Sequence, residues 1–91
     1  MKLKTNYGKV VTGHKKATDA GIRILKEGGN AIDAAIAAAS TLAVAIPNMN
    51  GLGGDSIALY YPSKKKKILK INGSGRSPKK ASIKYFKNLG L

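Results

Sequence analysis

The sequence predicts an α+β fold in which a strand, two helices, a β-hairpin and a final helix follow one another. A run of β-branched residues at 10–12 indicates the first strand. Apolar residues then recur with the period of a helix from residue 17, and they alternate as in a strand from residue 56 to 61. The 91 residues allow one domain at most, and we expect residues 1–91 to be part of a single domain with no internal boundary.

The first strand is expected at Lys9–Thr12, and the first helix is expected to begin at Lys15. One face of this helix is apolar and consists of Ala17, Gly21, Ile24 and Leu25. Gly28 and Gly29 are expected to end the helix, because glycine adopts the left-handed conformation of a helix C-cap at little cost.

The second helix is expected from Ala31 to about Ile46. Asn30 is predicted to be its N-cap and Asp33 the reciprocal partner, since a carboxylate also suits the positive end of the helix dipole. The helix is nearly apolar on every side, which is typical of a helix in the interior of a larger protein. We therefore expect the chain to be part of something larger and to expose apolar surface by itself.

The second half of the chain predicts a hairpin and a short helix. The strands Ser56–Tyr61 and Lys67–Ile71 are expected to pair antiparallel around a turn with four consecutive lysines. Loops are expected at 48–55 and 72–78. Ser82 is expected to cap the final helix.

Positive charge dominates the composition: 17 Lys and Arg oppose 4 Asp and Glu, a net charge of +13. Residues 64–91 contain ten basic residues and no acidic one. Lysine side chains usually stay solvated, so the favoured interpretation is a solvated face or a partner with an acidic surface. The alternative is a non-enzymatic basic module that binds nucleic acid or another polyanion. Proteins that recognise specific nucleic-acid sequences, however, depend more on arginine than on lysine. A relic of a split gene is a third interpretation.

The residue types exclude several classes of chemistry. Without cysteine there is no disulfide, Cys-ligated zinc, iron–sulfur cluster or thiolate catalysis. One histidine and four acidic residues make a self-contained metal site unexpected, and no cofactor is expected. Residues 1–7 lack the apolar core of a secretory signal. The apolar stretch Ala34–Ile46 is shorter than the about 20 residues that cross a bilayer, so a cytoplasmic location is expected.

Two candidate sites have simple structural interpretations. The glycine-rich loop Gly51–Asp55 leaves a helix and enters a strand, which is the reverse of a phosphate-binding loop, and Asp55 would repel a phosphate. A tight turn, or a backbone wall beside a ligand, is favoured instead. No nucleophile lies beside the single histidine, His14, so a helix-capping or packing role is favoured over that of a general base.

Arg76 differs from the other basic residues. It is the one arginine outside the first helix. It lies in a loop where Gly73 and Gly75 allow the backbone to approach a ligand closely. A guanidinium in such a loop suits bidentate binding of a carboxylate. From the residues alone, an ordinary surface arginine stays the favoured interpretation.

The segment from Ala20 to Ala35 is similar to the start of the γ-glutamyltransferases, also called γ-glutamyltranspeptidases, and the similarity covers about residues 8–82. The residues that carry it are Ala20-Gly21-x-x-Ile24-Leu25-x-x-Gly28-Gly29-Asn30-Ala31-x-Asp33-Ala34-Ala35, then Ala37-Ala38, Pro47, Gly51-x-Gly53-Gly54 and Gly75-Arg76-x-Pro78. The string Gly-Gly-Asn-Ala-x-Asp-Ala-Ala is the specific part of the match.

The resemblance implies an N-terminal segment of the large subunit of an N-terminal-nucleophile (Ntn) hydrolase with an αββα sandwich. In this family a precursor cleaves itself, and the new amino-terminal Thr of the small subunit attacks the γ-glutamyl amide, with its own α-amine available as base. The acyl-enzyme passes the glutamyl group to water, an amino acid or a peptide. Glutathione is the usual donor, and no metal or organic cofactor is implied.

Carried over residue by residue, the resemblance implies that Arg76 binds the donor's α-carboxylate. It implies an architectural role for Gly28, Gly29, Asn30, Asp33, Gly51, Gly53, Gly54 and Asp55. No catalytic residue falls in this chain, so we expect it to be inactive without the rest of the large subunit and a Thr-led small subunit. The family often has Asp-Gly-Arg-Glu around the arginine, whereas Ser77 follows Arg76 here. This departure leaves the donor open among glutathione, another γ-glutamyl compound and a related acyl amide.

Overall fold

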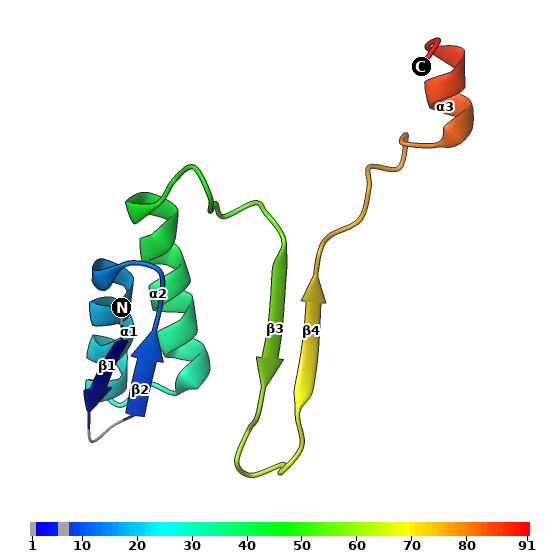
Figure 1. Ribbon diagram of the computed structural model, residues 1–91. Coiled ribbons are helices and arrows are strands. Elements are labelled where there is room, and N and C mark those ends of the chain that lie inside the picture. The colour runs from blue at the N-terminus through cyan, green and yellow to red at the C-terminus, as the bar shows by residue number, and fades with distance from the viewer. Residues whose placement is uncertain (1, 6–7) are drawn as a thin grey trace. The chain divides into compact units, whose positions relative to one another are not determined.

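The computed structural model describes residues 2–5 and 8–91, which fall into two compact units, Met1–Gly54 and Asp55–Leu91 (Figure 1). The first unit contains the strands β1 (Lys2–Thr5) and β2 (Gly8–Val11) and the helices α1 (Lys15–Lys26) and α2 (Ala31–Ala45). The second unit contains β3 (Ser56–Tyr60), β4 (Leu69–Gly73) and the helix α3 (Ile83–Asn88). Helices beside antiparallel strand pairs confirm the α+β class. The expectation of a single domain with no internal boundary stays a prediction.

An antiparallel hairpin opens the first unit, with β1 paired to β2 from Lys2 opposite Val11 to Thr5 opposite Gly8. The sequence analysis placed β2 one residue too late and did not predict β1. Leu3 is the one large apolar residue of β1, so neither a β-branched run nor an alternation marks this segment. Pairing with β2, which the local sequence does not encode, makes it a strand.

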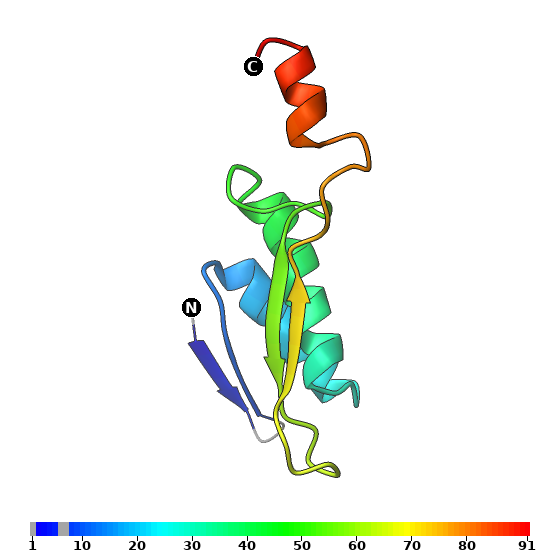
Figure 2. The ribbon, with the colours of Figure 1, turned by 90° about the vertical axis from the view of Figure 1, so that its right-hand side faces the viewer.

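The core of the first unit lies where α1 contacts both α2 and β2 (Figure 2). Its buried residues are Ala17, Thr18, Gly21, Ile22, Ala34 and Ala38. A Cβ atom on Gly21 would lie 2.9 Å from Val10 Cγ1 and 3.5 Å from the Ala34 carbonyl oxygen. Small residues at this crossing therefore let the three elements approach closely, and larger ones would have to displace them.

Both helices of the first unit have the caps that the sequence predicts. His14 Nδ1 accepts a hydrogen bond of 3.1 Å from the Lys16 N–H at the start of α1, which confirms its capping role. Gly28 follows α1 with φ of +95°, in the left-handed region that favours glycine. At the start of α2, the Asn30 side chain accepts from the Asp33 N–H and the Asp33 carboxylate accepts from the Asn30 N–H, each at 2.9 Å. This reciprocal pair is a complete capping box.

The second unit is built on the antiparallel pair of β3 and β4, with Ser56 opposite Gly73. The sequence analysis placed β4 at Lys67–Ile71, two residues too early. The lysine-rich turn is longer than expected, because the N–H of Lys66 bonds to the Pro62 carbonyl and Lys66 itself adopts φ of +48°. The turn thus uses residues that the alternating pattern assigned to the strand.

The final helix α3 begins where the sequence predicts, since Ser82 Oγ accepts a hydrogen bond of 3.1 Å from the Tyr85 N–H. None of the helices in residues 2–5 and 8–91 has both the length and the apolar character needed to cross a bilayer.

Apolar side chains are widely exposed in both units. Between residues 55 and 91 no residue is buried, and the exposed fraction is 76% for Ile57 and 77% for Ile83. On α2, Val44 is 81% exposed. The expected exposure of apolar side chains is therefore confirmed in both units.

Candidate functional site

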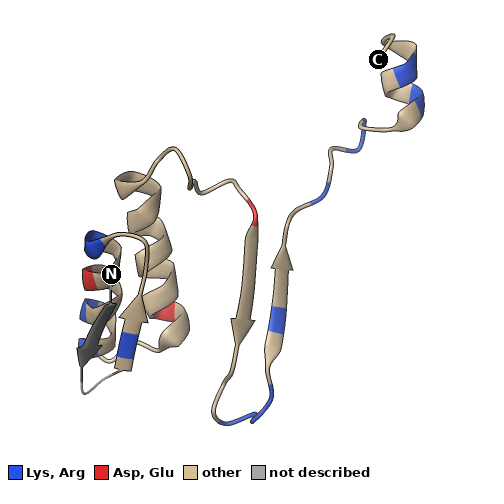
Figure 3. Ribbon diagram, viewed as in Figure 1, with Lys and Arg blue, Asp and Glu red and all other residues tan. Residues whose placement is uncertain are grey.

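Arg76 lies between β4 and α3, in a segment without regular secondary structure (Figure 1). Its side chain is exposed and has no hydrogen bond or ion pair with any residue in the part of the chain that the structure describes. Residues 56–91 contain no acidic residue that could neutralise it (Figure 3). The guanidinium donors of Arg76 are therefore available to an external carboxylate.

Three features restrict the backbone between Asn72 and Arg76. Asn72 Oδ1 accepts hydrogen bonds from the Ser74 N–H at 3.2 Å and from the Ser74 hydroxyl at 2.6 Å. A Cβ atom on Gly73 would lie 2.7 Å from the Ser56 carbonyl oxygen, so this glycine packs closely against β3. Gly75 has φ of +80°, a conformation that favours glycine. The two glycines are expected from the sequence, whereas the Asn72–Ser74 contact is not, although an asparagine side chain often bonds to the backbone two residues further along.

Half of the predicted motif residues lie in the connection between α1 and α2 or in the first turn of α2. Besides Gly28, Asn30 and Asp33, described above, the connection contains Gly29, whose N–H bonds to the Ile24 carbonyl at 2.9 Å. A Cβ atom on Gly29 would lie 2.5 Å from Ile24 Cγ2. A tight backbone path at the end of α1 therefore requires glycine at position 29.

The other half, Gly51, Gly53, Gly54 and Asp55, forms the loop between α2 and β3. A Cβ atom on any of the three glycines would meet no atom within 4 Å, and none of the three has a positive φ. Nothing in the described residues therefore requires glycine there. The architectural role of this loop stays a prediction, which would be explained by a close approach of another part of the protein or of a ligand.

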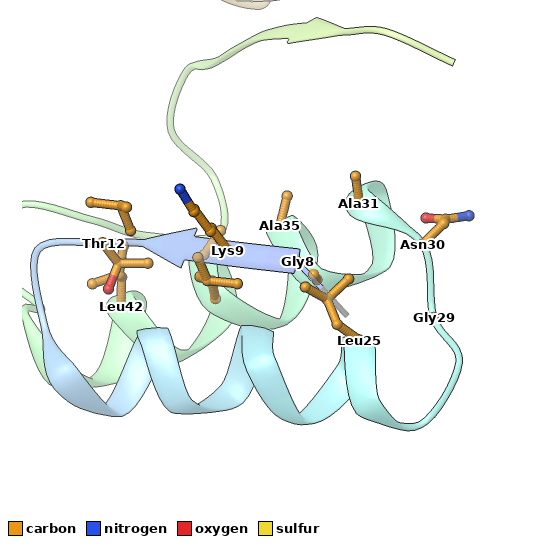
Figure 4. Close-up of a pocket in the computed structure, with 14 residues that line it drawn as sticks. Gly8, Lys9, Thr12, Leu25, Gly29, Asn30, Ala31, Ala35 and Leu42 are labelled. Carbon is orange, nitrogen blue, oxygen red and sulfur yellow. The ribbon is translucent and has the colours of Figure 1, made fainter. Parts of the chain in front are cut away.

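An apolar groove of about 730 Å³ lies in the first unit and is lined by β2, α2 and Leu25 at the end of α1 (Figure 4). Ala31, Ala35 and Ala39 contribute one wall, because residues four apart lie on the same face of a helix. The sequence analysis recognised the apolar helix but did not locate the groove, which depends on how β2 lies beside α2. Arg76 belongs to the other unit and does not line it.

Hydroxyl and imidazole groups of the first unit are used for structure. Thr12 Oγ1 lies 2.7 Å from Thr18 Oγ1 and donates a hydrogen bond of 2.7 Å to the His14 carbonyl. His14 Nδ1 is occupied by its cap, so this nitrogen is not available to act as a base toward a nucleophile. Among the described residues, no group of three or more His, Cys, Asp or Glu side chains could hold a metal ion.

A sequence model of the gamma-glutamyltranspeptidase family matches residues 17–90, which include both candidate regions. The chain therefore belongs to the gamma-glutamyltranspeptidase family, as the motif at residues 20–35 predicts. Its structure is similar to that of a gamma-glutamyltranspeptidase from Pseudomonas nitroreducens solved with L-DON, with a TM-score of 0.78 and 32% sequence identity. The similarity covers 88% of this chain and 23% of the solved one, and it confirms the fold class.

Particular relatives have different activities in their names. A glutathione hydrolase-like YwrD proenzyme from Bacillus subtilis is 49% identical over 78 residues, which are 86% of this chain and 15% of the relative. An oxamate amidohydrolase proenzyme from Klebsiella pneumoniae is 39% identical over 82 residues, 90% of this chain and 15% of the relative. The chain thus spans about 15% of the length of these relatives. The comparisons do not favour the non-enzymatic basic module.

Proposed function

We propose that this chain is the N-terminal segment of the large subunit of an Ntn hydrolase that transfers or hydrolyses γ-glutamyl groups of glutathione-like donors. Its direct contribution to the reaction is Arg76, which binds the α-carboxylate of the donor. The observation that carries this proposal is an exposed guanidinium without a partner among the described residues, in an acid-free segment of a chain that matches the family. Bidentate pairing of guanidinium with carboxylate supplies both charge and orientation.

The remainder of the large subunit and a Thr-led small subunit complete the enzyme. The 15% coverage of the relatives and the exposed apolar side chains support this part of the proposal. Because the nucleophilic Thr lies outside this chain, the 91 residues alone do not turn over a γ-glutamyl anilide, and co-expression with the remainder restores turnover. Turnover by the pure chain, undiminished in variants with each Thr changed to Ala, would contradict this account of the nucleophile.

The proposed role of Arg76 requires a donor that has a carboxylate. Glutathione and oxamate, which occur in the names of relatives, are both amides that also have a carboxylate. We propose a γ-glutamyl amide as the donor for this chain, since the relatives named for glutathione outnumber the oxamate one among those compared. Parallel assays with a γ-glutamyl anilide and with oxamate discriminate between the two amides.

Replacement of Arg76 tests the binding role. A suitable enzyme is a chimaera in which this chain replaces the matching segment of the Bacillus subtilis relative, which is 49% identical over 78 residues. Arg76→Ala raises KM for the γ-glutamyl donor about tenfold or more, because a charge-assisted pair is lost, while kcat changes less. Arg76→Lys gives an intermediate KM, because the charge stays and the planar fork is lost.

Lys67→Ala is the matched control, since it removes the same charge from an exposed position in the same unit and leaves KM unchanged. A donor analogue without the α-carboxylate gives the second control, because its KM does not respond to Arg76→Ala. If Arg76→Ala leaves the KM of the intact donor unchanged, Arg76 is not part of the site.

We also propose that the complete enzyme is cytoplasmic, which is the location expected from the sequence. Cell fractionation measures this directly, with the enzyme recovered beside a cytoplasmic marker. Recovery of the enzyme with an exported marker would contradict the proposed location.

A further inference from the structure

Asn72 is the next-to-last residue of β4, and only Gly73 lies between it and the loop that contains Arg76. Its register partner in β3 is Ile57, so its backbone position is set by the strand pair. Its side-chain oxygen Oδ1 accepts two hydrogen bonds from Ser74, one of 3.2 Å from the backbone N–H and one of 2.6 Å from the hydroxyl. These two bonds close the chain around Gly73 and determine the direction in which the loop leaves the sheet.

Gly73 and Gly75 restrict the same short path. The close approach of Gly73 to the Ser56 carbonyl holds the first residue of the path against β3. Gly75, at φ of +80°, turns the backbone once more immediately before Arg76. Only three residues separate Asn72 from Arg76, so a change in the turn moves the Cα atom from which the guanidinium extends.

An arginine side chain loses considerable rotamer entropy when it binds a ligand. A backbone that already has the bound conformation limits this cost to the side chain itself, whereas a free loop would add the cost of ordering several residues. Arg76 has no other support, because its side chain has no partner among the residues that the structure describes. The turn at Asn72 lies directly before the Arg76 loop and can therefore orient it.

We propose that Asn72 is a positioning residue, whose side-chain carbonyl holds the Arg76 loop in the conformation that binds the donor's carboxylate. This inference rests on the proposed function of Arg76. Asn72 touches neither the donor nor the reacting atoms. Its effect is therefore expected in KM, with little change in kcat and in thermal stability, because its side chain is exposed.

The test uses the chimaeric enzyme described above. Asn72→Ala removes the acceptor of both hydrogen bonds and is expected to raise KM for a γ-glutamyl anilide about three- to tenfold, with kcat within about twofold. Ser74→Ala removes the hydroxyl bond and keeps the N–H bond, so a smaller increase in KM is expected. Asn72→Ser keeps an acceptor oxygen that can form the same kind of turn without adding a charge near Arg76, and it is expected to restore KM to within about threefold of the parent.

Asn88→Ala is the matched control, since this exposed asparagine lies at the end of α3 and is expected to leave KM unchanged. The inference is overturned if Asn72→Ala leaves KM unchanged while Arg76→Ala raises it, and the proposed function then stands. It is also overturned if Asn72→Ala lowers kcat and the thermal midpoint together, because a general structural role would produce that result. If Arg76→Ala itself has no effect on KM, the proposed function fails and this inference fails with it.

Discussion

The two compact units differ in what holds them together. The first has buried residues at the contact of α1 with α2, hydrogen-bonded caps at the start of both helices and a glycine at the crossing with β2. The second has no buried residue, and its structure consists of one strand pair, a lysine-rich turn and a capped helix of six residues. A two-stranded hairpin is only marginally stable by itself, so the second unit depends on the rest of the protein more than the first does.

This difference agrees with the binding role that we propose for Arg76 in the second unit. The residues of the first unit are used for packing and capping, whereas the exposed loop of the second unit contains Arg76. Binding residues often lie on loops that a more rigid scaffold positions. The following substitutions test whether stability belongs mainly to the first unit.

Gly21→Val is expected to have the largest effect. Its Cβ atom would lie 2.9 Å from Val10 Cγ1, and the two further methyl groups would enter a core that is already closely packed. Overpacking of this kind costs about 1–3 kcal/mol, and a lower urea midpoint of the chimaeric enzyme measures it. Gly13→Ala is the control, because its Cβ atom would lie 3.7 Å from Ile46 Cδ1, which is an ordinary van der Waals contact. Equal midpoints for the two variants would show that the crossing at Gly21 is loose.

Asn30→Ala is expected to have an intermediate effect. It removes the acceptor for the Asp33 N–H and leaves one side of the capping box without its partner. The loss of such an N-cap costs about 1 kcal/mol, which the same urea titration measures. Asn48→Ala, in the exposed loop after α2, serves as the comparison and is expected to change the midpoint little. A larger loss for Asn48→Ala than for Asn30→Ala would be inconsistent with a cap that supports α2.

Lys66→Gly is expected to have the smallest effect, and in the opposite direction. Lys66 adopts φ of +48°, a conformation that costs a residue with a side chain about 1 kcal/mol relative to glycine. Glycine removes this cost, but it also raises the conformational entropy of the unfolded chain, which offsets part of the stabilisation. The result is a hairpin that is stabilised slightly or left unchanged, measured by amide hydrogen exchange of β3 and β4. Lys65→Gly, at a residue without positive φ, is the control and is expected to increase exchange. The opposite order of the two variants would show that the turn has another conformation.

The sequence alone determined the local features of this protein. The caps of His14, Asn30 and Ser82 were predictable because their hydrogen bonds join residues two or three apart. The motif from Ala20 to Ala35 likewise placed the chain in its family, and Arg76 was singled out by its glycine-rich surroundings.

Only the tertiary structure decided the features that depend on residues far apart in the chain. β1 is a strand because β2 lies beside it, and the groove exists because β2 lies beside α2. The start of β4 was predicted too early, because the register with β3 and the length of the turn, rather than alternation of side chains, decide where pairing begins. The physical reason is that strand pairing and helix packing depend on contacts between residues far apart in the chain. Helix caps and the helical period of apolar residues depend only on residues a few positions apart.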